Sequence, residues 1–282
     1  MRRLQRRELS EMTDAPLMLE LKNIKKTFNK GTINEKPALV GVSLKLNPGD
    51  FCTIIGGNGA GKSTTLNAIA GVWPVDSGSI IVDGENITGL PEHKRAEFLG
   101  RVFQDPMTGT AATMQIDENL ALAARRGNRR GLRWGISREE QEIYREQLKS
   151  LELGLEDRMT QKVGLLSGGQ RQALTLLMAT LKKPKLLLLD EHTAALDPKT
   201  AEKVLNLTNE IVARDSLTAL MVTHNMHDAI RMGNRLIMMN EGKIIYDVAG
   251  EEKKHLQVQD LLDKFSDVSN GHFANDRMML GV

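Results

Sequence analysis

The sequence predicts an α/β fold with a mostly parallel sheet, and three features indicate it. A glycine-rich loop at 56–63 lies between an apolar run at 51–55 and a helix-compatible segment at 64–70. Two more apolar runs, at 186–189 and 219–223, are short and uninterrupted. Runs of this kind are typical of parallel strands covered on both faces. Together they predict an open α/β sheet whose strands are buried on both sides.

The glycine-rich loop predicts a phosphate-binding site. Its sequence, GGNGAGKST, fits the pattern G-x-x-x-x-G-K-[ST] and follows a strand, as this motif requires. Glycines let backbone N–H groups face one phosphate chain, and the next helix directs its positive end at the same phosphates. Lys62 is placed to reach the terminal phosphates, and the Ser63 hydroxyl to bind Mg²⁺. The predicted nucleotide contacts are Gly56, Gly57, Asn58, Gly59, Ala60, Gly61, Lys62, Ser63 and Thr64.

Apolar runs and turn signals predict the other elements. Residues 1–16 are polar and charged, and we expect them to form a disordered leader. Strands are expected at 17–28, 39–46 and 79–83, and the region 105–165 has a helical pattern, with Ile143, Leu148 and Leu151 on one face. The C-terminal predictions are a hairpin around Asn240-Glu241-Gly242, with strands at 235–239 and 243–248, a short helix at 257–265 and a loose tail at 266–282.

Composition limits the class of protein. The chain has 282 residues and is 40% hydrophobic, which suffices for one large domain or a domain with a subdomain. A net charge of +2 argues neither for nor against nucleic acid as a partner of the whole chain. The single cysteine, Cys52, lies in an apolar strand and is expected to be a buried thiol, as suits a reducing cytosol. The sequence contains no apolar run long enough to span a bilayer, so a membrane role is expected to come through a partner.

Polar side chains follow two of the predicted parallel strands. Ligands of open α/β sheets bind outside the carboxyl ends of the strands. Asp190 is placed there to hold Mg²⁺ through water, and Glu191 to polarise the water that attacks the terminal phosphate. His224 ends another strand and is placed to contact the same phosphate. The plain alternatives are a strand-end acid and a core histidine, but the glycine loop requires a metal ligand and a water-positioning group.

The stretch LSGGQRQ, at 166–172, predicts a second anion-binding element. Ser167 and Gln170, three residues apart, form a capping box that starts a helix running to Lys182. An exposed helix N-terminus can hold an anion. The plain alternative is a well-capped helix without a ligand. One ATP needs only one glycine loop, so a second phosphate-binding element suggests a dimer.

These motifs, in this order and spacing, make the chain resemble the nucleotide-binding subunit of an ABC transporter over about residues 18–262. LSGGQRQ is highly specific by itself. The resemblance implies ATP and Mg²⁺ as cofactors and gives roles to matching residues. The implied roles are adenine stacking for Phe28, Mg²⁺ binding for Ser63, Gln104 and Asp190, a link to a helical subdomain for Gln104, general-base catalysis for Glu191, switching for His224, and a crossing to the partner subunit for Asp197.

The resemblance also implies an architecture. It predicts one ATPase domain at 17–265, in which the α/β core carries an antiparallel β subdomain and a helical subdomain at about 105–164. Two copies are expected to sandwich two Mg-ATP molecules. Each site would combine the glycine loop of one copy with four residues of the other copy: Ser167, Gly168, Gly169 and Gln170. The implied catalytic residues are Lys62, Gln104, Glu191 and His224.

The implied partners are a second copy, a membrane permease and a substrate-binding lipoprotein, at the cytoplasmic side of the cell membrane, with no nucleic acid. The stretches DEHTAALD and VFQDPMTGTAATM, with the arginine-rich segment at 125–133, resemble a bacterial importer branch of which some members are proposed to carry tryptophan or tyrosine. The family commonly reads D-E-P-T-S-A-L-D, so His192 and Ala194 depart from it. This departure puts the geometry of the cross-dimer loop in doubt, but not hydrolysis.

Two other classes stay open. A soluble ABC ATPase that serves assembly or a nucleic-acid process shares these motifs, although translation types usually carry two cassettes and repair types a long coiled coil. A phosphoryl-transfer kinase shares the glycine loop but leaves LSGGQRQ unexplained. The segment RRGNRRGLR at 125–133 has no acidic residue, and Trp134 follows it. We expect a membrane-proximal surface there, with a solvated basic loop as the plain alternative.

Overall fold

A computed structural model of the chain describes residues 16–128 and 135–268, with side chains as far as residue 266. Three predictions fall wholly or partly outside the described residues. They are the leader at 1–16, the second half of the arginine-rich segment with Trp134, and most of the tail at 266–282.

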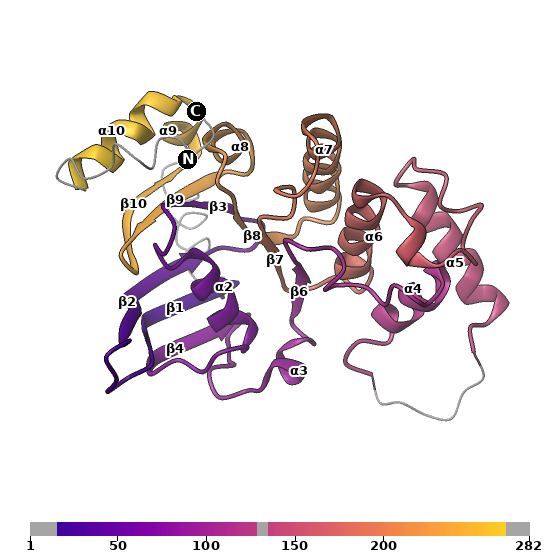
Figure 1. Cartoon of the computed structure of the whole chain (residues 1–282), viewed down its shortest axis with the longest axis horizontal. Helices are drawn as coiled ribbons and strands as arrows, with labels where there is room; N and C mark the ends of the chain where they lie inside the picture. Colours follow the sequence, from indigo (N-terminus) through magenta and orange to yellow (C-terminus); the bar gives the residue numbers. More distant parts are fainter. Residues whose placement is uncertain (1–15, 129–134, 269–282) are drawn as a thin grey trace, which may run out of the picture.

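A six-stranded sheet forms the centre of the molecule, with strand order β10-β9-β3-β8-β7-β6 (Figure 1). The pairs from β9 to β6 are all parallel, and only β10 pairs antiparallel, with β9, among the described strands. This arrangement confirms the predicted mostly parallel sheet. The strands are β3 (Phe51–Ile55), β6 (Leu99–Val102), β7 (Leu186–Asp190), β8 (Thr218–Val222), β9 (Arg235–Asn240) and β10 (Lys243–Ala249).

The leucine run of β7 is buried on both faces, as its composition predicts. Leu186 and Leu188 pack into a cluster with the helix that follows the glycine loop, α2 (Lys62–Ala70). Leu187 and Leu189 point into a second cluster on the opposite face of the sheet. β7 therefore packs against both halves of the core, and its carboxyl end presents Asp190.

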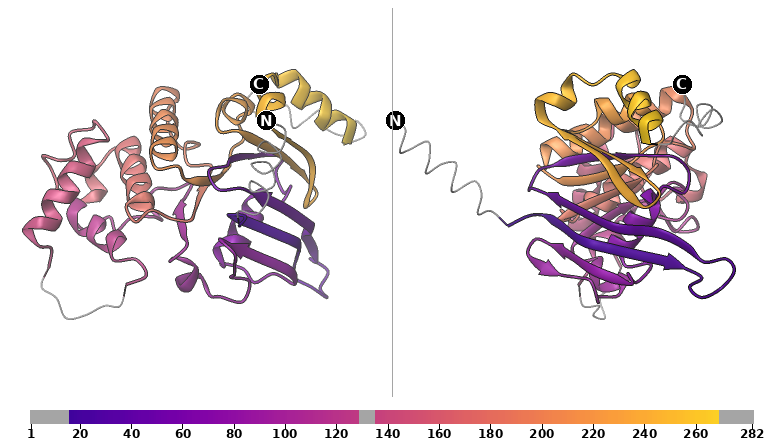
Figure 2. Two further views of the ribbon diagram at one scale, coloured as in Figure 1. Left: turned by 180° about the vertical axis from the view of Figure 1, so that it is seen from behind. Right: turned by 90° about the vertical axis from the view of Figure 1, so that its left-hand side faces the viewer.

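A second, antiparallel sheet has the order β2-β1-β4-β5 and lies on the α2 side of the molecule (Figures 1 and 2). Its core includes side chains from α2, so this helix is buried between the two sheets. The predicted antiparallel subdomain is thus present. Its strands are β1 (Leu19–Phe28), β2 (Lys36–Leu46), β4 (Ser77–Val82) and β5 (Glu85–Asn86), followed by the short helix α3 (Glu92–Arg95).

Helices gather at the other end of the molecule (Figure 1). Tyr144 and Leu148, four residues apart in α5, pack into one cluster with α4 and α6. The prediction that Ile143 shares this face is wrong, because Ile143 is 51% exposed. The helices are α4 (Ile116–Ala124), α5 (Arg138–Lys149) and α6 (Gly168–Thr180), with the 3-10 turn η1 (Val163–Leu165) between the last two.

The predicted hairpin after β9 is confirmed. Asn240 pairs with Lys243, which leaves Glu241 and Gly242 as a two-residue loop. Both have positive φ angles, 47° and 74°, as a type I′ turn requires.

The remaining helices include one that was not predicted, α7 (Pro198–Arg214), which packs on the opposite face of the sheet from α2. The others are α8 (Met226–Arg231), α9 (Gly250–Lys254) and α10 (Val258–Val268), the last where a short helix was expected. No helix within 16–128 and 135–268 is long and apolar enough to cross a bilayer.

Candidate functional site

The glycine loop connects β3 to α2 and is pressed closely against neighbouring backbone. A Cβ atom on Gly56 would lie 2.3 Å from the Met239 carbonyl oxygen, and one on Gly61 would lie 2.7 Å from the Ala38 carbonyl oxygen. Gly61 also has a φ of 101°, which L side chains rarely adopt. The loop therefore requires glycine at these positions, and a tight glycine loop of this kind can present backbone N–H groups to an anion.

Lys62 is folded back over this loop. Its side chain is 5% exposed, and its Nζ donates hydrogen bonds to the carbonyls of Gly56, at 2.7 Å, and Gly57, at 3.1 Å. Burial lowers the pKa of Lys62, while the nearby carboxylates Asp190 and Glu191 oppose this shift. A cation is thus held where the motif requires one.

Ser63 and Asp190 meet at the carboxyl edge of the sheet. The Ser63 hydroxyl donates a hydrogen bond to Asp190 Oδ1 at 3.2 Å. Burial raises the pKa of Asp190, and the charge of Glu191 adds to this effect, while Arg101 opposes it. A serine hydroxyl beside a carboxylate is a pair of hard oxygen donors, the kind that Mg²⁺ prefers. The donor chemistry therefore fits the predicted metal.

Glu191 and His224 are in direct contact through Oε2 and Nε2. They come from neighbouring strands, because the end of β7 pairs with β8 at Asp190 and Val222. The Glu191 side chain is 9% exposed and that of His224 37%, so the pair opens to solvent on the histidine side. Glu191 has a φ of 47°, and its N–H donates to the Val222 carbonyl at 3.0 Å.

Gln104 and Phe28 are positioned from other strands. Gln104 is exposed and follows β6, which pairs with β7, so it lies at the same sheet edge as Asp190. The preceding carbonyl, of Phe103, accepts a hydrogen bond from Gln172 of α6 at 3.3 Å. Phe28, at the end of β1, packs edge-on against Trp73 with ring centroids 4.8 Å apart. Trp73 was not predicted as a site residue, because nothing in the sequence except its aromatic character indicates that it contacts Phe28.

The second predicted helix start is a capping box, as expected. Ser167 Oγ accepts from the Gln170 N–H at 3.3 Å, and Gln170 Oε1 accepts from the Ser167 N–H at 3.2 Å. Gly168 and Gly169 lie between them, and a Cβ on Gly169 would be 2.2 Å from Thr200 Cγ2. Asp197 caps α7 by accepting from the Thr200 N–H at 3.1 Å. The LSGGQRQ segment and Asp197 are therefore close neighbours.

The two predicted phosphate-binding helix starts lie on different parts of one chain. Figure 1 shows α2 between the two sheets and α6 beside α4 and α5. Within one chain, Ser167 is thus grouped with α7 rather than with the glycine loop.

The first two arginines of the arginine-rich segment, Arg125 and Arg126, form side-chain contacts with neighbouring helices. Arg126 donates to the carbonyls of Ala179, at 3.3 Å, and Lys182, at 2.9 Å, at the C-terminal end of α6. Arg125 pairs with Glu140 at 3.2 Å. The prediction of a membrane-proximal surface is therefore wrong for Arg126, because its guanidinium caps a helix.

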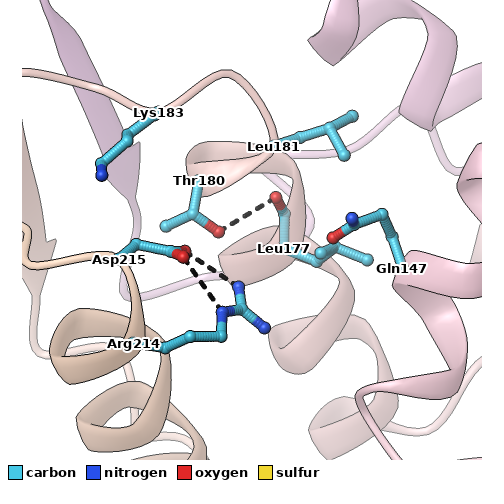
Figure 3. A pocket seen from close by; sticks show the side chains of 7 residues that line it. All are labelled: Gln147, Leu177, Thr180, Leu181, Lys183, Arg214 and Asp215. Carbon is cyan, nitrogen blue, oxygen red and sulfur yellow. Dashed lines mark hydrogen bonds and ion pairs between the residues drawn. The ribbon is translucent and has the colours of Figure 1, made fainter.

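A cavity at the far end of α6 from Ser167 has a different character (Figure 3). Three of the polar side chains that line it, Arg214, Asp215 and Thr180, already form hydrogen bonds. Arg214 donates to both Asp215 oxygens, at 3.0 and 2.9 Å, and the Thr180 hydroxyl donates to the Leu177 carbonyl at 3.2 Å. This cavity lies between α5, α6 and α7 and is not part of the candidate site.

Comparison with known proteins identifies close relatives. The family model for ABC transporters matches residues 39–194. The chain is 44% identical over 248 residues to the tyrosine transport ATP-binding protein of Clostridioides difficile (strain R20291), covering 88% of this chain and 98% of that protein. The dimeric ATP-binding cassette MJ0796 in a post-hydrolysis state with ADP and Pi matches with a TM-score of 0.70 and 31% identity, over 82% of this chain and 98% of that one. The ADP conformation of the cassette MJ1267 matches with a TM-score of 0.73 and 29% identity, over 88% and 98%.

Proposed function

The chain belongs to the ABC transporter family as an ATP-binding, ATP-hydrolysing subunit, and from this premise we propose that it powers the import of an aromatic amino acid through a separate membrane permease. The relative named for tyrosine transport supports this substrate class, since the similarity covers nearly all of both chains. The protein would act at the cytoplasmic side of the cell membrane, held there by the permease, with a lipoprotein delivering the substrate.

The observation that carries the catalytic assignment is the contact between Glu191 and His224 at the carboxyl edge of the sheet. In our proposal Glu191 accepts a proton from the water that attacks the terminal phosphate of ATP. His224 holds the Glu191 carboxylate in place and contacts the same phosphate from its exposed side. Lys62, released from the Gly56 and Gly57 carbonyls, pairs with the phosphate oxygens.

Ser63 and Asp190 are the residues that would hold Mg²⁺, with Gln104 reaching the site from the end of β6. When bound, Mg²⁺ supplies positive charge that offsets the developing charge on the phosphate oxygens. Phe28 would stack on the adenine, with Trp73 supporting its ring from the edge.

We further propose that each site is completed by a second copy of this chain. The N–H groups at the start of α6, from Ser167 to Gln170, would face the terminal phosphate bound by the partner's glycine loop. Asp197 would cross toward the partner beside them. Dimeric cassettes among the relatives support this arrangement.

The loop after Gln104 is the proposed connection to the permease. Met107 is 42% exposed in this loop, and the hydrogen bond from Gln172 to the Phe103 carbonyl links the loop to α6. A movement of Gln104 on nucleotide binding would therefore reach both α6 and the surface that Met107 presents.

Uptake of the amino acid by cells of the source organism tests this function. A strain lacking this chain would be complemented with the wild type, with Glu191→Gln, or with the surface control Glu202→Gln. We expect wild type and Glu202→Gln to restore uptake of labelled tyrosine or tryptophan, and Glu191→Gln to fail despite binding ATP. Unchanged uptake in the deletion strain would favour the soluble, non-transport alternative, and restored uptake by Glu191→Gln would contradict the role of Glu191.

A further inference from the structure

His192, directly after Glu191, is buried deep in the molecule. Its side chain is 2% exposed, and its Nε2 lies 3.0 Å from the hydroxyl oxygen of Thr208, which is itself fully buried in α7. Sixteen positions separate the two residues. His192 thus joins the end of β7 to the middle of α7.

The hydrogen bonds of Thr208 settle the direction of this contact. The Thr208 hydroxyl donates to the Val204 carbonyl at 2.8 Å, so its single proton is already in use. It must therefore accept from His192, which places the imidazole proton on Nε2. The unprotonated Nδ1 is buried with no hydrogen-bond partner among the described residues. A buried unpaired acceptor is unfavourable, so this histidine is poorly explained as a residue that stabilises the core.

The backbone of Glu191 needs support from both sides. Its φ of 47° is rarely adopted by residues with a side chain, and such conformations persist only when the surroundings determine them. On the N-terminal side, β7 and the hydrogen bond from the Glu191 N–H to the Val222 carbonyl fix the chain. On the C-terminal side, the Glu191 carbonyl accepts from the Ala194 N–H at 2.9 Å, and the first side chain that anchors the turn to another element is that of His192.

From this geometry we propose that His192 is a positioning residue for hydrolysis, which acts through its hydrogen bond to Thr208 by clamping the turn that carries Glu191 onto α7. The inference rests on the proposed role of Glu191 as the base. The family pattern carries proline at this position, which restricts the backbone but has no hydrogen-bond donor. In this chain the hydrogen bond between His192 and Thr208 holds the turn instead.

The same clamp connects Glu191 to the LSGGQRQ segment. Thr208 and Thr200 belong to α7, and Thr200 packs directly against Gly169 at the start of α6. A shift of α6 and α7 at the dimer interface would therefore move the anchor of Glu191. His192 gives this carboxylate a physical connection to the surface that the partner subunit is expected to meet.

The test compares the kcat and KM for ATP of purified variants, with melting temperatures measured in parallel. The amide nitrogen of glutamine can reach the position of Nε2, whereas that of asparagine corresponds to Nδ1. We expect His192→Asn, His192→Leu and Thr208→Val to lower kcat by roughly 10-fold to 100-fold, the range that misplacement of a catalytic group produces. KM should stay within about twofold, because His192 and Thr208 lie outside the predicted nucleotide contacts. His192→Gln should recover most of kcat, and the exposed His93→Asn is the matched control.

The outcomes separate this inference from the proposed function. His192→Leu should keep its melting temperature while losing kcat, since leucine removes the unpaired Nδ1 together with the hydrogen bond. If kcat, KM and melting temperature change together and His192→Gln rescues none of them, the role is structural and the inference fails. If Glu191→Gln is inactive but His192→Asn and His192→Leu keep wild-type kcat, only the inference fails. If Glu191→Gln itself turns over ATP, the proposed function fails.

Discussion

The Ser63 hydroxyl donates a hydrogen bond to Asp190 over 3.2 Å and so joins residues 127 positions apart. Ser63 stands at the start of α2 and Asp190 at the end of β7, on two elements that pack into the same hydrophobic cluster. The core thus brings together a hydroxyl and a carboxylate that the sequence separates widely. Their oxygen chemistry is the basis of the proposed Mg²⁺ site.

Asp190→Asn should keep the hydrogen bond from Ser63 but remove the charge that attracts the metal. We expect the tighter ATP binding that Mg²⁺ confers to weaken by about 10-fold or more, the effect of losing one charged contact. Titration calorimetry with Mg²⁺ and with EDTA measures the difference. Equal enhancement by Mg²⁺ in the variant and the wild type would exclude Asp190 as a metal ligand.

Lys62→Ala should weaken ATP binding and abolish turnover, because the buried cation above the glycine loop is lost. The loss of charge-assisted hydrogen bonds to phosphate predicts a rise in Kd of about 10-fold to 100-fold. Lys45→Ala, which removes an exposed lysine that pairs with Glu20, is the control. Wild-type binding by Lys62→Ala would remove the assigned role of Lys62.

Met107→Ala should uncouple hydrolysis from transport. Met107 is exposed after Gln104, so its loss should lower uptake in cells more than it lowers basal ATPase activity of the purified protein. Ile33→Ala changes an apolar side chain that is 98% exposed on the antiparallel subdomain, and it serves as control. Equal loss of both activities would indicate a folding defect. Met114 is a less clean probe, since it is partly buried and its carbonyl accepts from the Val163 N–H.

Cys52 predicts a pH dependence of stability. Burial raises the pKa of its thiol from 9.0 to about 12. Above pH 9.0 the unfolded chain therefore loses this proton before the folded chain does, so the free energy of unfolding should fall as the pH rises toward 12. The slope from this one group is at most about 1.4 kcal/mol per pH unit. Urea unfolding between pH 8 and 10.5 should show a shallower decline in Cys52→Ala, and parallel declines would refute the assignment.

Much of the fold and of the candidate site could be predicted from residues that are close together in the sequence. The glycine loop, the capping box at Ser167 and the hairpin at Glu241-Gly242 depend on residues close together in the sequence. The strand β7 could also be predicted without knowing which elements it packs against, because a strand buried on both faces has apolar residues in an unbroken run.

Most of the errors and omissions involve contacts between residues that are distant in the sequence. Arg126 caps α6 more than fifty positions away, and Trp73 meets Phe28 only because the antiparallel subdomain forms. The link from His192 to Thr208 requires α7, a helix absent from the sequence prediction although Asp197 followed by Pro198 is a typical helix start. Ile143 is the exception, because its neighbour Tyr144 takes the buried position on α5 and leaves Ile143 51% exposed.

In our proposal each ATP site is shared between two copies of the chain. Lys62→Ala damages the glycine loop, and Ser167→Arg blocks the start of α6, so each variant alone should be inactive. A heterodimer isolated through two different tags would retain one intact site, which combines the glycine loop of the Ser167→Arg copy with Ser167 of the Lys62→Ala copy. The measurement is ATP hydrolysis by this isolated heterodimer. We predict clear recovery above either parent, and no recovery would contradict a shared site and place each site within one subunit.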